Sequence, residues 1–166
     1  MKQERQLFNQ AYDLCEEGRF KEALKVYNKI LKSSPKNIGA LIDKGVTLQN
    51  LGEFEKSIKA YDKALKIEPN NVDALVNKGS ALHSVEKYDS AIECYDSAIR
   101  LDSKCAMAYA YKGLSLGEQD RVKEALSYFK KALSIDKEYD LANISKEMAQ
   151  DILKSIKDKQ LDAKKQ

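Results

Sequence analysis

The chain has 166 residues, enough for one ordinary domain, and its 29 Lys and Arg against 26 Asp and Glu residues give a formal net charge of +3. This near balance argues against a nucleic-acid-binding protein, which usually carries a clear basic excess on one face. No apolar run approaches the ~18 residues that span a membrane, and the N-terminal segment lacks the apolar stretch of a secretory signal.

The cysteines Cys15, Cys94 and Cys105 are odd in number and show no paired spacing. Structural disulfides persist mainly in oxidising compartments, and zinc sites use closely spaced pairs of Cys or His. We therefore expect free thiols in a cytoplasmic protein, with no metal site and no cofactor.

A 34-residue unit recurs along the chain without insertion or deletion, at residues 4–37, 38–71, 72–105 and 106–139. One position holds leucine in all copies (Leu14, Leu48, Leu82 and Leu116), and another holds an aromatic residue (Tyr27, Tyr61, Tyr95 and Phe129). A fixed period of roughly 20–50 residues indicates stacked structural units that bury a core between neighbours.

Each unit is predicted to form a helical hairpin. In the second copy the packing residues recur at three- and four-residue steps, first at Leu41, Gly45 and Leu48 and then at Ile58, Tyr61 and Leu65. Gly52 between these two patterns suits the end of a helix, and Pro69 after the second pattern cannot continue one. The two predicted helices of a unit are named helix A and helix B.

Small residues indicate where the helices approach closely. We expect Gly45 and Ser57 at the contact between helix A and helix B of one hairpin, and Ala64 where helix B meets the next helix A. The larger Leu48 and Tyr61 are expected to fill the space around these contacts. One hairpin alone cannot bury such faces, so the prediction requires stacking of about three or more units.

After Tyr139 the repeat signature ends. Five apolar residues then follow three- and four-residue steps, at Leu141, Ile144, Met148, Ile152 and Ile156. This spacing predicts one long amphipathic helix at about residues 140–160. Terminal repeats need a polar outer face, so we expect this helix to cap the stack.

The pattern resembles the tetratricopeptide repeat (TPR) over residues 4–139, through the small residue in helix A and the aromatic residue, alanine and proline that follow. The resemblance implies an all-α, right-handed α-solenoid of four helical hairpins with a C-terminal solvating helix, in a single domain of residues 1–166. The chain departs from the family at Lys44, Lys78 and Lys112, where an apolar residue is usual. We expect their stems to cover apolar surface while their charges reach water.

No set of residues has the arrangement of a catalytic site. His83 is the single histidine, and no phosphate-binding loop sequence is present. Gly45, Gly79 and Gly113 recur at the repeat period, so we assign them to packing. The sequence therefore predicts a protein that is not an enzyme, with no catalytic residue.

In TPR proteins, the face of helix A opposite its packing side lines a concave groove that holds ligands. By this resemblance the groove is apolar, through Phe8, Tyr12, Ile42, Val46, Val76, Met107, Tyr111 and Leu114. Its charges are mostly acidic, with Glu16, Asp43, Asp73 and Glu118 against Arg5. Asn77 can donate to and accept from a ligand backbone. The predicted binding residues are Phe8, Tyr12, Ile42, Asp43, Val46, Asn77, Tyr111 and Leu114.

Chaperone-binding TPR domains hold a C-terminal carboxylate with Lys, Arg and Asn side chains. The matching positions here are Phe8, Tyr12, Asp43, Asp73 and Asn77, or, one repeat later, Ile42, Val46, Asn77, Met107 and Tyr111. Neither set supplies the cations that a carboxylate requires. We therefore expect a neutral or basic, partly apolar protein or peptide, and no chaperone carboxylate, nucleic acid or membrane span.

Three functional hypotheses remain open. The leading one is a non-enzymatic protein-protein interaction scaffold that binds a peptide or helix segment in the groove. The second is a self-assembling scaffold, in which the apolar and basic C-terminal helix docks into the acidic groove of another copy or pairs with its counterpart. The third is an accessory recognition subunit of an enzyme complex.

Overall fold

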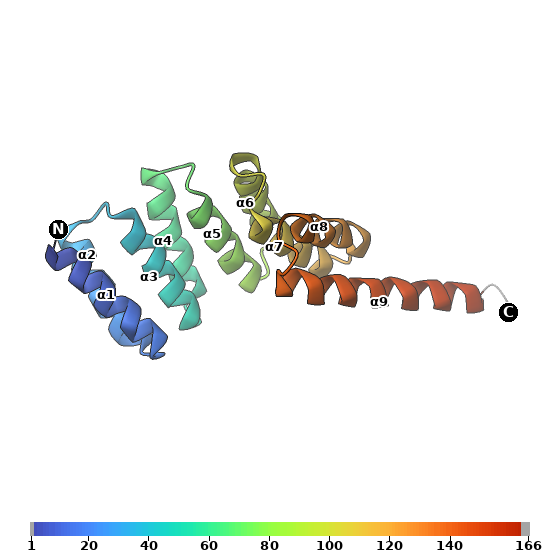
Figure 1. The fold of residues 1–166 in the computed structure, drawn as a ribbon, viewed down its shortest axis with the longest axis horizontal. Coiled ribbons are helices and arrows are strands. Elements are labelled where there is room, and N and C mark those ends of the chain that lie inside the picture. Colours follow the sequence, from blue (N-terminus) through green and yellow to red (C-terminus); the bar gives the residue numbers. More distant parts are fainter. Residues whose placement is uncertain (1, 164–166) are drawn as a thin grey trace. The chain divides into compact units, whose positions relative to one another are not determined.

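The computed structural model describes residues 2–163, with the side chains of residues 2, 152 and 155–163 outside that description. Over the described range the chain is all-α, and its helices follow one another through short turns (Figure 1). The helices are α1 (Lys2–Glu16), α2 (Phe20–Ser33), α3 (Ile38–Asn50), α4 (Phe54–Ile67), α5 (Val72–Ser84), α6 (Tyr88–Leu101), α7 (Ala106–Glu118), α8 (Val122–Ile135) and α9 (Asp140–Ala163).

The chain divides into two compact units, Met1–Glu86 and Lys87–Gln166. In the first unit, α1 pairs with α2 and α3 pairs with α4, while α2 packs on α3 and α4 packs on α5. In the second unit, α7 pairs with α8, and α6 and α9 pack on α7 and α8 respectively. Each unit is therefore a segment of an α-solenoid built from helical hairpins, as predicted. The prediction of one domain over residues 1–166 stays a prediction.

The repeat period sets where the helices begin. The helices α3, α5, α7 and α9 start 34 residues apart, at Ile38, Val72, Ala106 and Asp140. Asn37 and Asn71 precede the first two of these helices, and their side chains accept hydrogen bonds of 2.9 Å from the backbone N–H of Ala40 and Ala74. These N-caps satisfy a donor that the helix itself leaves unpaired. The helix starts thus follow the 34-residue period, while the predicted repeat boundaries stay a prediction.

One turn position needs a left-handed backbone in every repeat. Its φ is +71° at Gly18, +73° at Gly52, +60° at Glu86 and +60° at Asp120. Glycine adopts this conformation without the steric penalty that a Cβ brings. The turns at Glu86 and Asp120 therefore carry backbone strain that the first two turns avoid.

The predicted small-residue contacts are confirmed. A Cβ added at Gly45 would lie 2.6 Å from Cζ of Tyr61, well inside van der Waals contact. Ser57 and Ala64 are fully buried, and Ala64 packs with Ala74 of the next helix A. The recurring aromatic residues are buried as predicted (Tyr27, Tyr61, Tyr95 and Phe129).

The C-terminal helix α9 uses a different face from the predicted one. Its buried residues are Ala142, Ser145 and Ala149, whereas Ile144 is 59% exposed and Met148 is 61% exposed. The reason is that α9 begins at the repeat spacing, so Ala142 makes the close helix contact that Ala74 makes in the first unit. The side chains of Ile152 and Ile156, which the prediction placed on the same stripe, lie outside the described residues.

Candidate functional site

In the first unit, the predicted binding residues lie on the three helix A segments α1, α3 and α5. Tyr12 on α1 is 63% exposed, and Val46 on α3 is exposed as well. Both exposed apolar side chains lie on helix A segments of the same unit.

Phe8 and Ile42 are partly exposed and also pack against buried side chains. The Phe8 ring packs edge-on against Tyr27, with ring centroids 6.3 Å apart. A Cβ added at Gly39 would lie 3.9 Å from Cζ of Phe8, so this ring reaches the start of α3. Ile42 packs against the buried cluster that contains Ala64. Both side chains are half-buried.

Asp43 supplies a half-buried negative charge on the same face. Burial raises the pKa of this carboxyl group. Burial, and then the Asp43 charge, also raise the pKa of the Tyr27 and Tyr61 hydroxyls. Both tyrosines therefore stay protonated near neutral pH, and Tyr61 donates a hydrogen bond to Oε1 of Gln49.

Polar contacts tie the three helices together beneath this face. The Cys15 thiol lies 3.7 Å from the Thr47 hydroxyl, which joins α1 to α3. Nε2 of Gln49 donates to Oγ of Ser80 at 3.4 Å, which joins α3 to α5. Asn77 on α5 is half-buried, and its amide makes no hydrogen bond with another described side chain or with the described backbone. Its donor and acceptor are free for a ligand.

The prediction that Val76 faces the groove is wrong, because its side chain is 3% exposed and belongs to the core. The two predicted residues of the second unit, Tyr111 and Leu114, are half-buried. Tyr111 stacks on Tyr95 with ring centroids 6.0 Å apart, and Leu114 packs against a buried cluster that includes Phe129. The structure thus brings six predicted residues onto the first unit, while these two lie on the second and mainly support its packing.

Four family profiles match the chain. One, described as TPR repeat, matches residues 48–85, and three described as tetratricopeptide repeat match residues 7–37, 72–105 and 106–139. The chain belongs to the tetratricopeptide-repeat family. No curated protein matches this TPR chain.

Several solved structures share the fold. MamA is 26% identical, with 84% of this chain and 81% of MamA covered at a TM-score of 0.74. YrrB, described as a TPR protein with an unusual peptide-binding site, is 20% identical, with 85% and 73% covered at a TM-score of 0.74. The first TPR of Spaghetti (RPAP3), solved with the HSP90 peptide SRMEEVD, is 21% identical, with 70% and 92% covered at a TM-score of 0.67.

Two further features limit the chemistry of the TPR chain. Among the described residues, no group of three or more His, Cys, Asp and Glu side chains could hold a metal ion. In the same part of the chain, no helix is both long and apolar enough to cross a membrane.

The helix A lysines form a set of contacts that sequence reasoning missed. Lys78 pairs with Asp62 at 2.7 Å and Lys112 pairs with Asp96 at 2.5 Å, so each ammonium pairs with a carboxylate on the preceding helix B. Burial lowers the pKa of Lys112, but its hydrogen bonds to Asp96 and Tyr128 outweigh burial, so the pKa is raised overall. The sequence signal for these contacts was an acidic residue 16 positions before each of the two lysines, in a pair that recurs after 34 residues.

Proposed function

We propose that this TPR chain is a non-enzymatic scaffold that binds a peptide or helix segment of a protein partner on the helix A faces of its first unit. The observation that carries the proposal is the exposure of Tyr12 and Val46 on successive helix A segments. Aromatic anchors commonly supply much of the binding energy at protein interfaces. The fold likeness to YrrB, which has a peptide-binding site, supports the same reading.

The partner segment is neutral or basic and partly apolar. The exposed Glu16 and Asp73 and the half-buried Asp43 give this face a negative charge, which attracts cations and repels acidic tails. Asn77 offers an unpaired donor and acceptor to a peptide backbone. RPAP3 binds an acidic HSP90 peptide, but the corresponding positions here lack the cations for a terminal carboxylate.

Paired affinity columns test this proposal. One column carries the wild-type chain, and a second carries Tyr12→Glu with Val46→Glu. The matched control is Ile67→Glu with Leu101→Glu, which adds the same charges at other exposed apolar positions. We expect a bound protein that the wild type and the control retain and the Tyr12, Val46 variant loses. If all three columns retained the same proteins in equal amounts, the proposal would be contradicted.

The same experiment separates a scaffold from an accessory subunit of an enzyme, because the identity of the retained protein decides between them. The scaffold itself is assigned no catalytic role. The odd number and unpaired spacing of Cys15, Cys94 and Cys105 favour free thiols, so we propose a cytoplasmic location.

Self-assembly is a second candidate, favoured by the exposed apolar pair Ile144 and Met148 on α9. The exposed acids Glu147 and Asp151 lie beside this pair, and the sequence becomes lysine-rich from Lys154 onward. Two copies of α9 running antiparallel would set the acidic half of one helix against the basic half of the other. Sedimentation should show a dimer that Ile144→Glu with Met148→Glu disperses. A wild-type monomer at high concentration would exclude this candidate.

A further inference from the structure

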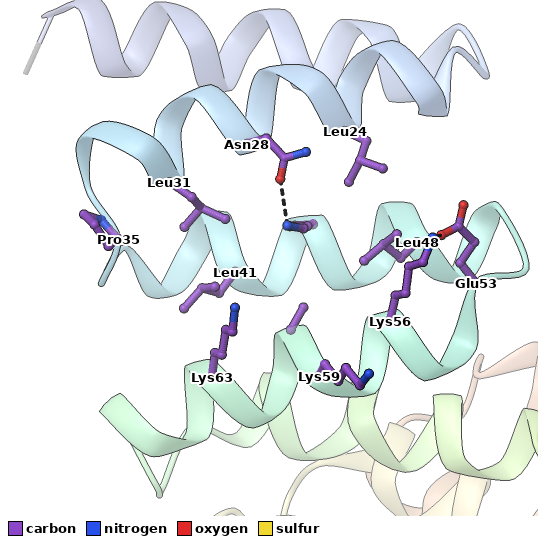
Figure 2. Close-up of a pocket in the computed structure, with 12 residues that line it drawn as sticks. Leu24, Asn28, Leu31, Pro35, Leu41, Leu48, Glu53, Lys56, Lys59 and Lys63 are labelled. Atoms are coloured by element: carbon purple, nitrogen blue, oxygen red, sulfur yellow. Dashed lines mark hydrogen bonds and ion pairs between the residues drawn. The ribbon is translucent and has the colours of Figure 1, made fainter.

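An open cavity of about 540 Å³ lies among α2, α3 and α4, all within the first unit (Figure 2). Its lining includes four leucines and Ala60, together with Lys44, Lys56, Lys59 and Lys63. Figure 2 shows Lys59 and Lys63 extending from α4 across from Leu31 and Asn28 of α2. A cavity of this size, apolar at its base with a few charges at its edge, has the character of a ligand site.

The charges of the cavity are unbalanced. Glu53 is the one carboxylate in its described lining, and it already pairs with Lys56 at 2.5 Å. The Lys44 ammonium donates to Oδ1 of Asn28 at 2.7 Å, and this amide carries no charge. Burial, and then the nearby Lys63, lower the pKa of Lys44, as expected for a half-buried cation without an opposite charge.

The other repeats show which group is missing. Asn28 stands at the repeat position of Asp62 and Asp96, which pair with Lys78 and Lys112. Both later lysines therefore have a carboxylate partner, whereas Lys44 has an amide in the same place. An anion from outside the chain would restore the ion pair.

The equivalent place in the second unit, among α6, α7 and α8, is filled. The Tyr128 ring lies 4.4 Å from the Lys112 ammonium and covers it. Tyr128 stands 68 positions after Ala60, and its ring stacks on Tyr109. A carboxylate and an aromatic ring thus occupy the site in the second unit. In the first unit, the Asn28 amide brings no negative charge and the small Ala60 brings no ring.

We propose that the cavity among α2, α3 and α4 binds an aromatic carboxylate, whose carboxylate pairs with Lys44 and whose ring lies over Ala60. The ligand reproduces the two groups, Asp96 and Tyr128, that close the equivalent site of the second unit. Lys59 and Lys63 add an attractive field for the anion. The same chemistry is offered by a free small molecule and by adjacent acidic and aromatic side chains of a peptide.

Titration of the isotope-labelled full chain, followed by backbone amide NMR, tests the proposal. The probes are phenylpropionate, its neutral amide phenylpropanamide, and the cation phenylpropylamine. We expect saturable shifts at the cavity residues with phenylpropionate, and at least tenfold weaker binding of the other two. The absence of shifts at millimolar phenylpropionate, or equal binding of all three probes, would overturn the proposal. An acetylated Asp-Phe amide distinguishes a peptide ligand from a free small molecule. If it binds more tightly than phenylpropionate, the natural ligand is a peptide with adjacent acidic and aromatic side chains. If it binds more weakly, the natural ligand is a small aromatic carboxylate.

Variants of the cavity sharpen the test. Asn28→Asp places an internal carboxylate beside Lys44, as in the later repeats, and we expect it to weaken phenylpropionate binding at least tenfold. Asn9→Asp on α1 makes the same charge change outside the cavity and should leave binding unchanged. In Ala60→Tyr, the new side chain should occupy the place of the ligand ring and prevent phenylpropionate binding. If that variant fails to fold, Asn28→Asp still tests the proposal, because Asn28 is exposed and its substitution should not disturb the core. Wild-type affinity in Asn28→Asp would contradict the assignment. The Tyr12→Glu, Val46→Glu variant should bind phenylpropionate normally, which keeps this proposal separate from the helix A surface.

Discussion

Substitution of Gly113 by alanine adds one carbon atom and tests whether close packing against helix B requires glycine at this position of helix A. A Cβ there would lie 2.5, 2.8 and 3.0 Å from Cε1, Cδ1 and Cζ of Phe129. Carbon atoms prefer a separation of about 3.5–4.0 Å, so the ring or the helix must shift by about 1 Å. Phe129 is buried in a packed cluster and has little room to move. Overpacking of this kind costs about 1–3 kcal/mol.

Gly117 provides the matched control, because it lies on the same helix and a Cβ there meets nothing within 4 Å. Alanine is favoured over glycine in a helix by about 0.5–1 kcal/mol, so Gly117→Ala should stabilise the chain. This propensity gain applies to both substitutions and largely cancels in their comparison. Gly113→Ala should therefore be less stable than Gly117→Ala by about 1–3 kcal/mol.

Urea denaturation followed by circular dichroism measures both variants. Truncation of the ring in Phe129→Leu should remove most of the penalty of Gly113→Ala, because the clashing atoms are gone. If Gly113→Ala were as stable as Gly117→Ala in the presence of Phe129, the close-approach explanation of the helix A glycines would be refuted.

Three other perturbations have defined outcomes. Glu86→Gly should stabilise the chain by about 0.5–1 kcal/mol, measured by urea denaturation, because relief of about 1–2 kcal/mol of left-handed strain at φ +60° exceeds the extra backbone entropy that glycine loses on folding. Asp43→Asn should raise the melting temperature at pH 7. Burial raises the pKa of Asp43 in the folded state above its unfolded value of about 3.9, so the wild type loses stability as the pH rises from about 3.9 through the folded pKa. The advantage of Asp43→Asn should therefore disappear when the solution is acidified below that range. Asp96→Asn should destabilise the chain by about 1–3 kcal/mol at pH 7, because the Lys112 ammonium loses its carboxylate. The pKa of Lys112 is higher in the folded than in the unfolded state, where it is about 10.4. The ion pair therefore stabilises the wild type fully below about pH 10.4, and this stabilisation disappears as the pH rises through the folded pKa of Lys112.

Controls accompany these three predictions. Lys87→Gly, one position beyond the strained turn, should give no stabilisation. No melting-temperature gain for Asp43→Asn at pH 7 would show that the buried charge carries no cost. An Asp96→Asn penalty that persists above the folded pKa of Lys112 would point to lost packing instead of a lost ion pair.

Sequence periodicity predicts the contacts that recur in each hairpin. Gly45 and Tyr61 can be paired from the amino-acid sequence alone, because both recur at one spacing and a small residue must face a large one. The hairpin boundaries follow from the same period, since helix starts and turn residues recur with it. Such features depend on local geometry that every repeat shares.

Exposure along helix A could not be predicted in the same way. Ile42, Val76 and Ala110 share one repeat position, yet Ile42 is half-buried while the other two are buried. The difference depends on side chains of neighbouring helices, which vary from repeat to repeat. The predicted helix at about residues 140–160 is present as α9, but its predicted packing face was wrong for a related reason. The predicted stripe included Ile144 and omitted Ala142, although packing favours the small residue at that contact.

Amide hydrogen exchange of the full chain, with and without the partner retained by the affinity column, tests the central claim most directly. The account predicts added protection on α1, α3 and α5, because the partner segment lies on the helix A faces of the first unit. Protection confined to α9 would indicate self-assembly, and protection confined to α2 and α4 would indicate the lysine-lined cavity. Either of these two results would contradict the proposed binding surface.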